Sequence, residues 1–503
     1  MSSQNTVEKK ANRNSIDMLH GPLVGKLFLF AIPLAFSSIF QQLFNSTDAI
    51  VAGRLLGSTE LAAIGGIAPL TALFISFFVG VSIGTNATIA IRIGEGDRSK
   101  IRAAVHTTAV IAIVSAVLVT VIGIAIAGFL VDSVGIPDEA RAESISYLRI
   151  YFAGVAFFLV FNFGSAILRA KGDTRRPLYA LAISAVVNAV LDIFAVSVLH
   201  LGAAGIAAAT VAAYALAAAI VIVMLMHEEE DFRLNVRELR VDKRALHQIL
   251  YIGVPSGLQG VVFAVSNIII QTSVNSFGTD AIAGSTAALN FEYYTYFIIN
   301  AFSQAAITFV GQNFAAGNLS RCDKIVAWSM GLSLGLSFAV SVALVSLGNT
   351  GLSIFTTEAG ALVFATTRLW HVELLECLPS TYEITAGALR VHPPDGRGYR
   401  RIVRAARHLC VHAVPAARQL RGAAEHLPCD LVRHWRYNDR TLSFRKEAHL
   451  REGTRKDRRT RAEAGSTHRK RRIAEGADSL ESETEAPRAQ ISSRLRQRVR
   501  RLR

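Results

Sequence analysis

The sequence has few cysteines and few charged residues for its length. Four cysteines are scattered through 503 residues, none of them in a CxxC pair, which argues against a disulfide framework or a cysteine-rich zinc site. Charged residues make up 18% of the chain and hydrophobic residues 51%, with a mean hydropathy of +0.37, and this composition is too apolar for an ordinary soluble protein. The polar residues 1–20 lead into an apolar run long enough to span a membrane, so no cleavable signal peptide is predicted. No residue spacing matches a metal or catalytic site, and the sequence predicts neither an enzyme nor a bound cofactor.

The few charges are distributed unevenly, and the chain divides into two parts on that basis. Residues 391–503 hold about 29 Lys and Arg against about 13 Asp and Glu, whereas residues 1–390 are nearly neutral, with about 24 and about 25. The basic part has no apolar run that could cross a membrane. We expect it to be a non-membrane tail without specific nucleic-acid binding, because it lacks interleaved aromatic residues or a binding motif.

The nearly neutral part predicts an all-α integral membrane protein with ten spanning helices. Each apolar run is about 20 residues or longer, enough to cross a hydrocarbon core. The runs lie near 24–50, 59–91, 103–131, 146–168, 177–199, 202–226, 248–275, 280–312, 326–348 and 361–389. Basic residues collect before the first run and after the second, fourth, sixth and eighth, so the positive-inside rule places the N-terminus in the cytoplasm. We expect the protein to lie in the plasma membrane.

The ten runs repeat at an offset of about 221 residues. Gly57-Ser58 recurs as Gly278-Thr279 and Leu168-Arg169 as Leu389-Arg390. Duplicated helix bundles are typical of secondary transporters. The expected organisation is a cytoplasmic segment (1–20), an N-lobe of six helices (21–226), a linker (227–247), an incomplete C-lobe of four helices (248–390) and the tail (391–503).

The second copy stops near Arg390, two helices before the first copy does. Residues 398–447 should mirror the fifth and sixth spans, but they carry many charges, each of which costs about 2.5–3.5 kcal/mol at a bilayer centre. We expect that a shift of reading frame after Arg390 replaced the last two helices.

Three polar residues inside the apolar runs are candidates for a functional site. Asp48 ends the first run, where it is either a cation-binding carboxylate or an interfacial helix cap. Asn188 and Asp192 are four residues apart and therefore share one helix face. An acid within a membrane is costly unless it is buried, protonated or ion-bound, so Asp48, Asn188 and Asp192 predict a shared proton or sodium site. The alternative is a structural hydrogen-bonded pair that ties the fifth span to its neighbours.

Four motifs give the sequence a resemblance to a known family. NSTDAIVAGRLLG (45–57), RAKGDTRRP (169–177), NAVLD (188–192) and TFVGQNFAAGN (308–318) together resemble the multidrug and toxic compound extrusion (MATE) family of cation-coupled efflux antiporters. The resemblance covers residues 20–390. It implies a two-lobe bundle of twelve helices, of which ten are present here, and it assigns cation coupling to Asp48, Asn188 and Asp192. The seventh span has no acid, which favours the DinF-like branch of the family.

The substrate cavity is predicted from polar residues in the remaining spans. Its candidates are Asn45, Gln259, Asn267, Glu292, Tyr296, Glu376 and Glu383. Glu292 has tyrosines beside it, which favours cationic substrates through cation–π attraction. The alternative for Glu292 is a buried hydrogen bond to a tyrosine.

The leading prediction is a proton- or sodium-coupled antiporter that exports small organic, cationic compounds across the bilayer. Three alternatives stay open: a non-transporting product of a damaged gene, a lipid-linked precursor flippase or polysaccharide exporter on a related scaffold, and a membrane-anchored nucleic-acid binder. The scarcity of Lys and Arg in the spans counts against the flippase, which would need a cationic cavity for anionic head groups. With only four of six C-lobe helices, the 503-residue chain is expected not to transport.

Overall fold

The described part of the chain is a bundle of long helices. A computed structural model describes residues 15–56, 58–134, 138–275, 277–353 and 358–391, all within the first of two compact units, Met1–Arg418. These residues contain no strand. The N-terminal half comprises α1 (Leu23–Val51), π-helix η1 (Ala52–Leu56), α2 (Ser58–Glu95), α3 (Arg98–Val134), α4 (Asp138–Lys171), α5 (Arg175–Ser197) and α6 (Gly202–Met226). After η2 (Val236–Glu238), the C-terminal half comprises α7 (Lys243–Asn275), α8 (Thr279–Ala315), α9 (Leu319–Leu352), α10 (Ala359–His371), η3 (Glu373–Leu375) and α11 (Pro379–Arg390).

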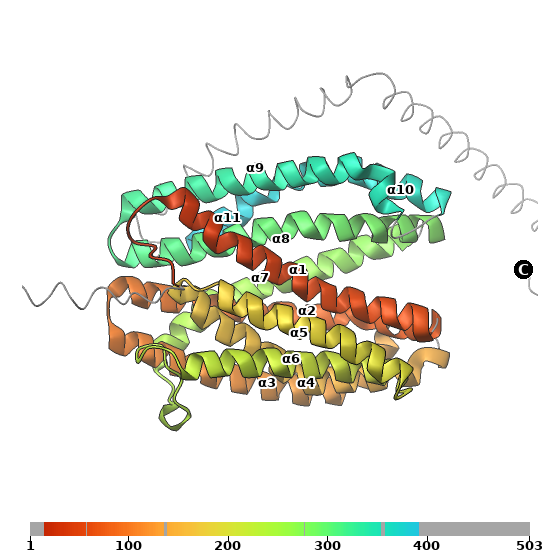
Figure 1. Ribbon diagram of the computed structural model, residues 1–503, viewed down its shortest axis with the longest axis horizontal. Coiled ribbons are helices and arrows are strands. Elements are labelled where there is room, and N and C mark those ends of the chain that lie inside the picture. The colour runs from red at the N-terminus through yellow and green to blue at the C-terminus, as the bar shows by residue number, and fades with distance from the viewer. Residues whose placement is uncertain (1–14, 57, 135–137, 276, 354–357, 392–503) are drawn as a thin grey trace, which may run out of the picture. The chain divides into compact units, whose positions relative to one another are not determined.

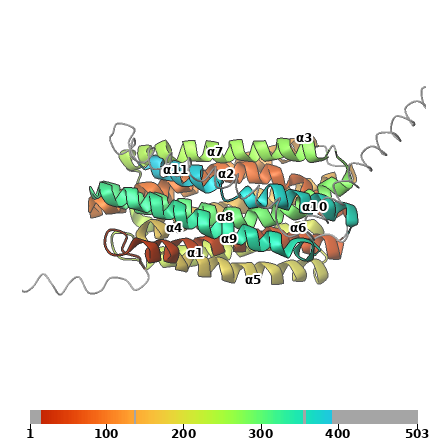
Figure 2. The ribbon, with the colours of Figure 1, turned by 90° about the horizontal axis from the view of Figure 1, so that it is seen from above.

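Most of these helices can cross a membrane, which confirms the predicted all-α membrane fold. Among the described residues, eight helical stretches are long and apolar enough: α1 with η1, then α2 to α7, and α9. Helix α8 has 37 residues but is more polar, and it runs alongside the others in both views (Figures 1 and 2). The predicted tail lies outside the described residues apart from Val391.

The tenth predicted span, 361–389, is wrong as a single continuous helix. Helix α10 ends at His371, a short 3-10 turn follows, and α11 begins at Pro379. Proline has no backbone N–H to donate within a helix and is tolerated in the first turn, so Pro379 starts a helix more readily than it continues one. Glu373, buried at this break, turns its side chain into the bundle.

Helix α1 packs against both halves of the molecule. Its first part, including Leu27, Phe30 and Leu34, shares one hydrophobic cluster with residues of α8, α9 and α11. Its second part, including Phe44 and Val51, belongs to the cluster formed by α2 to α6. Figure 1 shows α1 crossing obliquely from the group of α8, α9 and α11 towards α5 and α6. One helix thus joins the two halves.

Helices α2 and α7 approach closely because glycines line their contact. A Cβ added to Gly80 would lie 2.3 Å from the Gly257 Cα, and one added to Gly84 would lie 2.3 Å from the Ile249 carbonyl oxygen. In lipid, where the hydrophobic effect does not drive helices together, such small residues permit the close packing that holds them. Near this contact, the Asn86 Nδ2 donates to the Thr308 Oγ1 at 2.9 Å and links α2 to α8.

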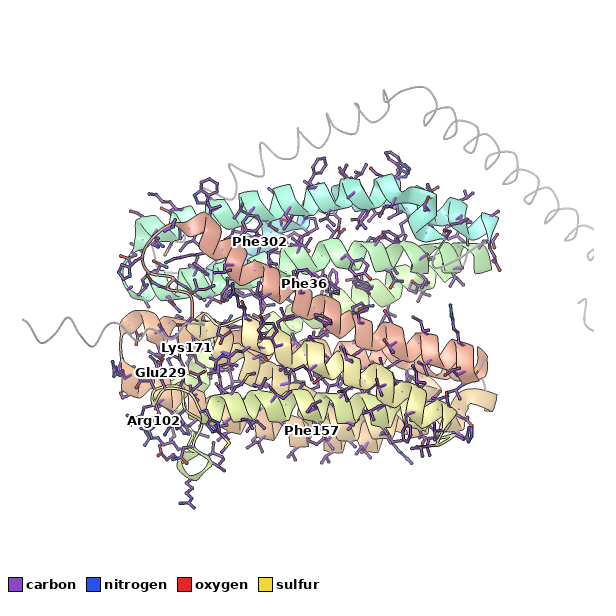
Figure 3. All side chains as sticks on the ribbon, in the orientation of Figure 1. Phe36, Arg102, Phe157, Lys171, Glu229 and Phe302 are labelled. Carbon is purple, nitrogen blue, oxygen red and sulfur yellow. The ribbon has the colours of Figure 1, made fainter. Side chains whose placement is uncertain are left out.

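The connections α2–α3, α4–α5, α6–α7 and α8–α9 lie at one end of the bundle, which we call the basic end. A network of charged side chains joins helices there. Lys171, at the end of α4, bonds the Glu228 carboxylate at 2.7 Å, and Arg176 of α5 pairs with the same carboxylate. Burial raises the pKa of Glu228, but the hydrogen bond and charge of Lys171 and the charge of Arg176 outweigh it, so the pKa lies below its ordinary value. Figure 3 shows Arg102, Lys171 and Glu229 together at this end.

The segment before α1 also lies at the basic end and contacts both halves. The Ile16 N–H donates to the Gly172 carbonyl in the α4–α5 connection at 3.3 Å. The Met18 carbonyl accepts from the Asn313 Nδ2 of α8 at 3.0 Å. The halves are therefore tied to each other at the basic end by main-chain as well as side-chain contacts.

Candidate functional site

A buried polar site lies in the N-terminal half, between α1, α5 and α6. The Asp48 side chain is 4% exposed, and its Oδ2 accepts a hydrogen bond from the Thr210 Oγ1 at 2.9 Å. The Asn188 Nδ2 lies 3.5 Å from the Asp48 Oδ1 and 3.3 Å from the Thr210 Oγ1. Asp48 is thus inside the bundle, and the alternative of an interfacial helix cap is wrong for this residue.

Asp192 completes the site from one turn further along α5. It is fully buried, as Asn188 is, because residues four apart share the face of α5 that packs against α1 and α6. The carboxyl groups of Asp192 and Asp48 interact directly. Neither oxygen of Asp192 accepts a hydrogen bond from a donor among the described residues, and neither does the Asn188 Oδ1.

These contacts leave a concentration of oxygen atoms without matching positive charge. Two ionised carboxylates side by side in a buried site would repel each other and lose their hydration. The arrangement is therefore suited to a proton shared by the two acids or to a small cation such as Na⁺. Carboxylate, amide and hydroxyl oxygens are hard ligands of the kind that such a cation prefers.

Aromatic side chains form the wall around the carboxylates. Tyr214 of α6 stacks on Phe44 of α1 with ring centroids 4.7 Å apart and meets Phe158 of α4 edge to face at 5.0 Å. Tyr147 and Tyr151 of α4 lie close enough to interact electrostatically with Asp48. These rings keep water from the acids, so each charge there interacts more strongly than it would in water.

Thr210 is a member of this site that the sequence did not reveal. The signal is present but weak, because Thr210 is one of few polar residues in the long alanine-rich run of α6. A lone threonine in a membrane helix usually bonds to its own backbone, and only the packing of α6 against α1 shows that its hydroxyl faces Asp48.

In the C-terminal half, Glu292 forms an ion pair that the sequence did not predict. The Arg368 Nε and Nη2 donate to its two carboxylate oxygens at 2.6 and 2.9 Å, and the Arg368 Nη1 donates to the Ser285 Oγ at 2.6 Å. The carboxylate partner in these contacts is therefore an arginine and not the tyrosine that was the alternative for Glu292. A cationic substrate at Glu292 would have to compete with Arg368.

Other predicted cavity residues gather around the broken tenth segment. The Gln259 Nε2 lies 3.4 Å from the Glu383 Oε1, and Tyr296 stacks on Phe263 at 5.8 Å. Tyr296 interacts electrostatically with Glu383 and Glu376. Asn45 of α1 and Asn267 of α7 are exposed, and the contacts that join the other candidates do not include them.

The fold and the site define a class of protein: a multi-pass, all-α membrane protein with a buried pair of acids enclosed by helices. The sequence matches the MatE family over residues 33–194 and 255–391. The chain belongs to the MATE family, and the second match ends where the predicted resemblance ends, just after Arg390.

Individual relatives agree with this assignment. The chain is 26% identical over 344 residues to the probable multidrug resistance protein YoeA of Bacillus subtilis, covering 67% of this chain and 74% of the relative. It is 24% identical over 341 residues to the probable multidrug resistance protein NorM of Thermotoga maritima, covering 66% and 72%. Among solved structures, it is similar to an outward-facing multidrug resistance MATE family transporter of the MOP superfamily, with a TM-score of 0.69, 21% identity and coverage of 77% and 86%.

Proposed function

We propose that this protein is a cation-coupled antiporter that exports small organic compounds, and that the coupling cation, H⁺ or Na⁺, binds at Asp48, Asn188, Asp192 and Thr210. The observation that carries the proposal is the buried Asp48–Asp192 pair, which lacks a cationic side chain among its hydrogen-bond and ion-pair partners in the described residues. A buried site of this kind gains stability when a cation arrives and loses it when the cation leaves.

Each residue of the site has a distinct part in the proposed binding and release of the cation. Asp192, without a hydrogen-bond donor, takes up the proton or faces the Na⁺. Asp48, held by Thr210, stays oriented towards it, and the Asn188 amide contributes a neutral oxygen. Loading the site removes the repulsion between the two carboxylates and so favours the packing of α1 against α5 and α6, which unloading disfavours. Because α1 also packs against α8, such a change can reach the other half of the molecule.

The substrate class is the finer part of the proposal. Relatives named as multidrug resistance proteins support organic substrates. Glu376 and Glu383 of the C-terminal half interact electrostatically with Tyr296. Together these residues offer carboxyl groups and an aromatic face, and a carboxylate and an aromatic face both attract an organic cation.

The test is ethidium accumulation in cells that express the chain. Wild-type protein lowers accumulation, whereas Asp192→Asn, which cannot titrate, returns it to the level of cells without the protein. The matched control is Asp132→Asn, because Asp132 is an exposed acid paired with Arg141 at 2.7 Å, and this variant keeps full efflux. Normal efflux by Asp192→Asn at normal membrane abundance contradicts the coupling site. No efflux by wild-type protein contradicts the transport itself and agrees instead with the sequence-based expectation that four C-lobe helices are too few for transport.

The proposed orientation puts the basic end, and with it the N-terminus, in the cytoplasm of a plasma membrane protein. A cysteine introduced at Ser99 should react with thiol reagents only from the cytoplasmic side. A cysteine introduced at Asp132, in the last turn before the α3–α4 connection, should react only from outside. Reversed labelling would contradict the orientation while leaving the coupling site untouched.

A further inference from the structure

The C-terminal half contains a second buried acid, far in sequence from the Asp48 site and built differently. Glu373 lies in η3, is fully buried, and accepts two hydrogen bonds on its Oε1, from the Thr295 Oγ1 of α8 at 2.5 Å and from the Ser341 Oγ of α9 at 3.0 Å. The two hydroxyls are themselves 3.5 Å apart. Three elements thus converge on one carboxyl group.

The internal repeat shows what this position contains in the other half. At the offset of 221 that relates Gly57 to Gly278 and Leu168 to Leu389, the counterparts of Thr295, Ser341 and Glu373 are Phe74, Thr120 and Phe152. These three also meet: the Phe74 and Phe152 rings pack edge to face at 5.7 Å, and the Thr120 Oγ1 donates to the Phe152 carbonyl at 3.0 Å.

The two halves fill the same place in the fold with side chains of different chemistry. In the N-terminal half, two aromatic rings fill the space between α2, α3 and α4, which shows that an apolar side chain suits the position. In the C-terminal half, a carboxyl group and two hydroxyls occupy the same place. Helix packing does not require the carboxyl group there, so its presence points to a ligand.

The second oxygen of Glu373 identifies the kind of ligand. The Glu373 Oε2 is buried and has no hydrogen-bond partner among the described residues. Glu373 interacts electrostatically with two other acids, Glu292 of α8 and Glu376 at the end of η3, and the Arg368 guanidinium of α10 is paired with Glu292. An ionised Glu373 would therefore be a buried charge beside other acids without a cation of its own, which is costly.

We propose that Glu373 is a proton-binding site of the C-terminal half, with the proton on Oε2 and the Thr295 and Ser341 hydroxyls holding Oε1. Protonation forms one O–H bond and neutralises the group, so the site binds and releases H⁺ without a further reactant. This site is separate from the Asp48–Asp192 pair, and the proposal holds whether or not the protein exports drugs.

Infrared spectroscopy of the purified full-length chain in lipid tests the proposal directly, because the carbonyl stretch of a protonated carboxyl group is resolved from that of a carboxylate. At neutral pH, Glu373→Gln should remove one component of the protonated-carboxyl band. The same component should remain in the Asp48→Asn, Asp192→Asn double variant and in the control Glu143→Gln, whose acid is exposed. An unchanged band in Glu373→Gln, or loss of the component in the double variant, would overturn the proposal.

A second variant keeps the test decisive if Glu373→Gln does not fold. Thr295→Val combined with Ser341→Ala leaves the acid in place but removes the donors to Oε1. The carbonyl component should then shift to higher frequency, since hydrogen bonding to the carbonyl oxygen lowers it. No shift would mean that these hydroxyls do not hold a protonated Glu373. Because neither readout measures efflux, failure here and failure of the proposed transport function are distinguishable.

Discussion

The two halves of this molecule share a repeat but use it for different chemistry. Asp48 of α1 is buried against α5 and α6, whereas the positions of α7 that the repeat relates to it, Ile269 and Ile270, are apolar and 62% and 52% exposed. Conversely, Phe152 of the N-terminal half corresponds to the buried acid Glu373. A duplicated sequence has thus kept the course of the helices while each half acquired its own buried acids in different places.

The helix contacts between the halves show the same combination of retained geometry and changed residues. Gly80 and Gly84 of α2 line the contact with α7, and their repeat counterparts in α8 are Ala301 and Ala305, which are buried in the cluster shared with α1. Both pairs use small residues, as close packing in lipid requires. Only the glycine pair is so tight that a Cβ would strike backbone atoms.

The largest effect is expected from making the N-terminal half resemble the C-terminal half. Phe152→Glu would place an acid in a buried position where the Phe74 and Tyr151 rings pack against the side chain. We expect a loss of about 4 kcal/mol or more, since removing a buried phenylalanine alone costs about 3–5 kcal/mol and the acid adds its own burial cost. Thermal unfolding of the purified protein measures this. An equally stable variant would mean that both halves accept an acid here and would weaken the comparison.

A somewhat smaller effect is expected at the α2–α7 contact. Gly84→Ala places a methyl group against the Ile249 carbonyl oxygen, and overpacking of this kind costs about 1–3 kcal/mol. The matched control is Gly331→Ala in α9, where an added Cβ meets nothing within 4 Å. A lower unfolding temperature for the first variant and an unchanged one for the second is the expected result, whereas equal behaviour would show that the contact is not as tight as described.

The basic end allows a milder test that depends on pH. Glu228→Gln removes the acid that Lys171 and Arg176 share, at a cost of about 2 kcal/mol for a charged hydrogen bond. Because the pKa of Glu228 in the folded protein lies below its ordinary value, its stabilising contribution is full at neutral pH and is lost as the pH falls through the lowered pKa. The difference in unfolding temperature between wild type and variant should therefore shrink in acid. A difference that grows as pH falls would reverse the sign and contradict the assignment.

Much of this architecture could be predicted from the sequence because lipid restricts a spanning segment to few forms. Long apolar runs become helices, since every backbone polar group must be satisfied within the segment, and nine of the ten predicted runs coincide with long helices. The tenth differs because hydropathy does not register the effect of Pro379 or the burial of Glu373. Helix α7 starts at Lys243, five residues before the predicted span, because the Asp242 side chain caps its first turn by accepting from the Ala245 N–H at 2.7 Å. Hydropathy does not register such a cap.

The site could be predicted only in part. The spacing of Asn188 and Asp192 fixes their common face, and the cost of burying an acid indicates that Asp48 and Asp192 lie inside the bundle. Thr210 and Arg368 were not predicted because their importance depends on which helix packs beside them. Tertiary contacts of that kind leave no periodic signal in the sequence. For the same reason, the aromatic wall of Tyr147, Tyr151 and Tyr214 could not be told from ordinary core residues.

Binding of the coupling cation by the Asp48–Asp192 pair is the basis of the proposed transport. It is tested most directly by ethidium movement in proteoliposomes with an imposed pH or Na⁺ gradient, comparing wild type with Asp192→Asn. Wild-type movement should follow one of the two gradients and reverse when that gradient is reversed, and Asp192→Asn should show no response to either. Gradient-driven movement of wild-type magnitude in Asp192→Asn would show that the coupling cation binds elsewhere.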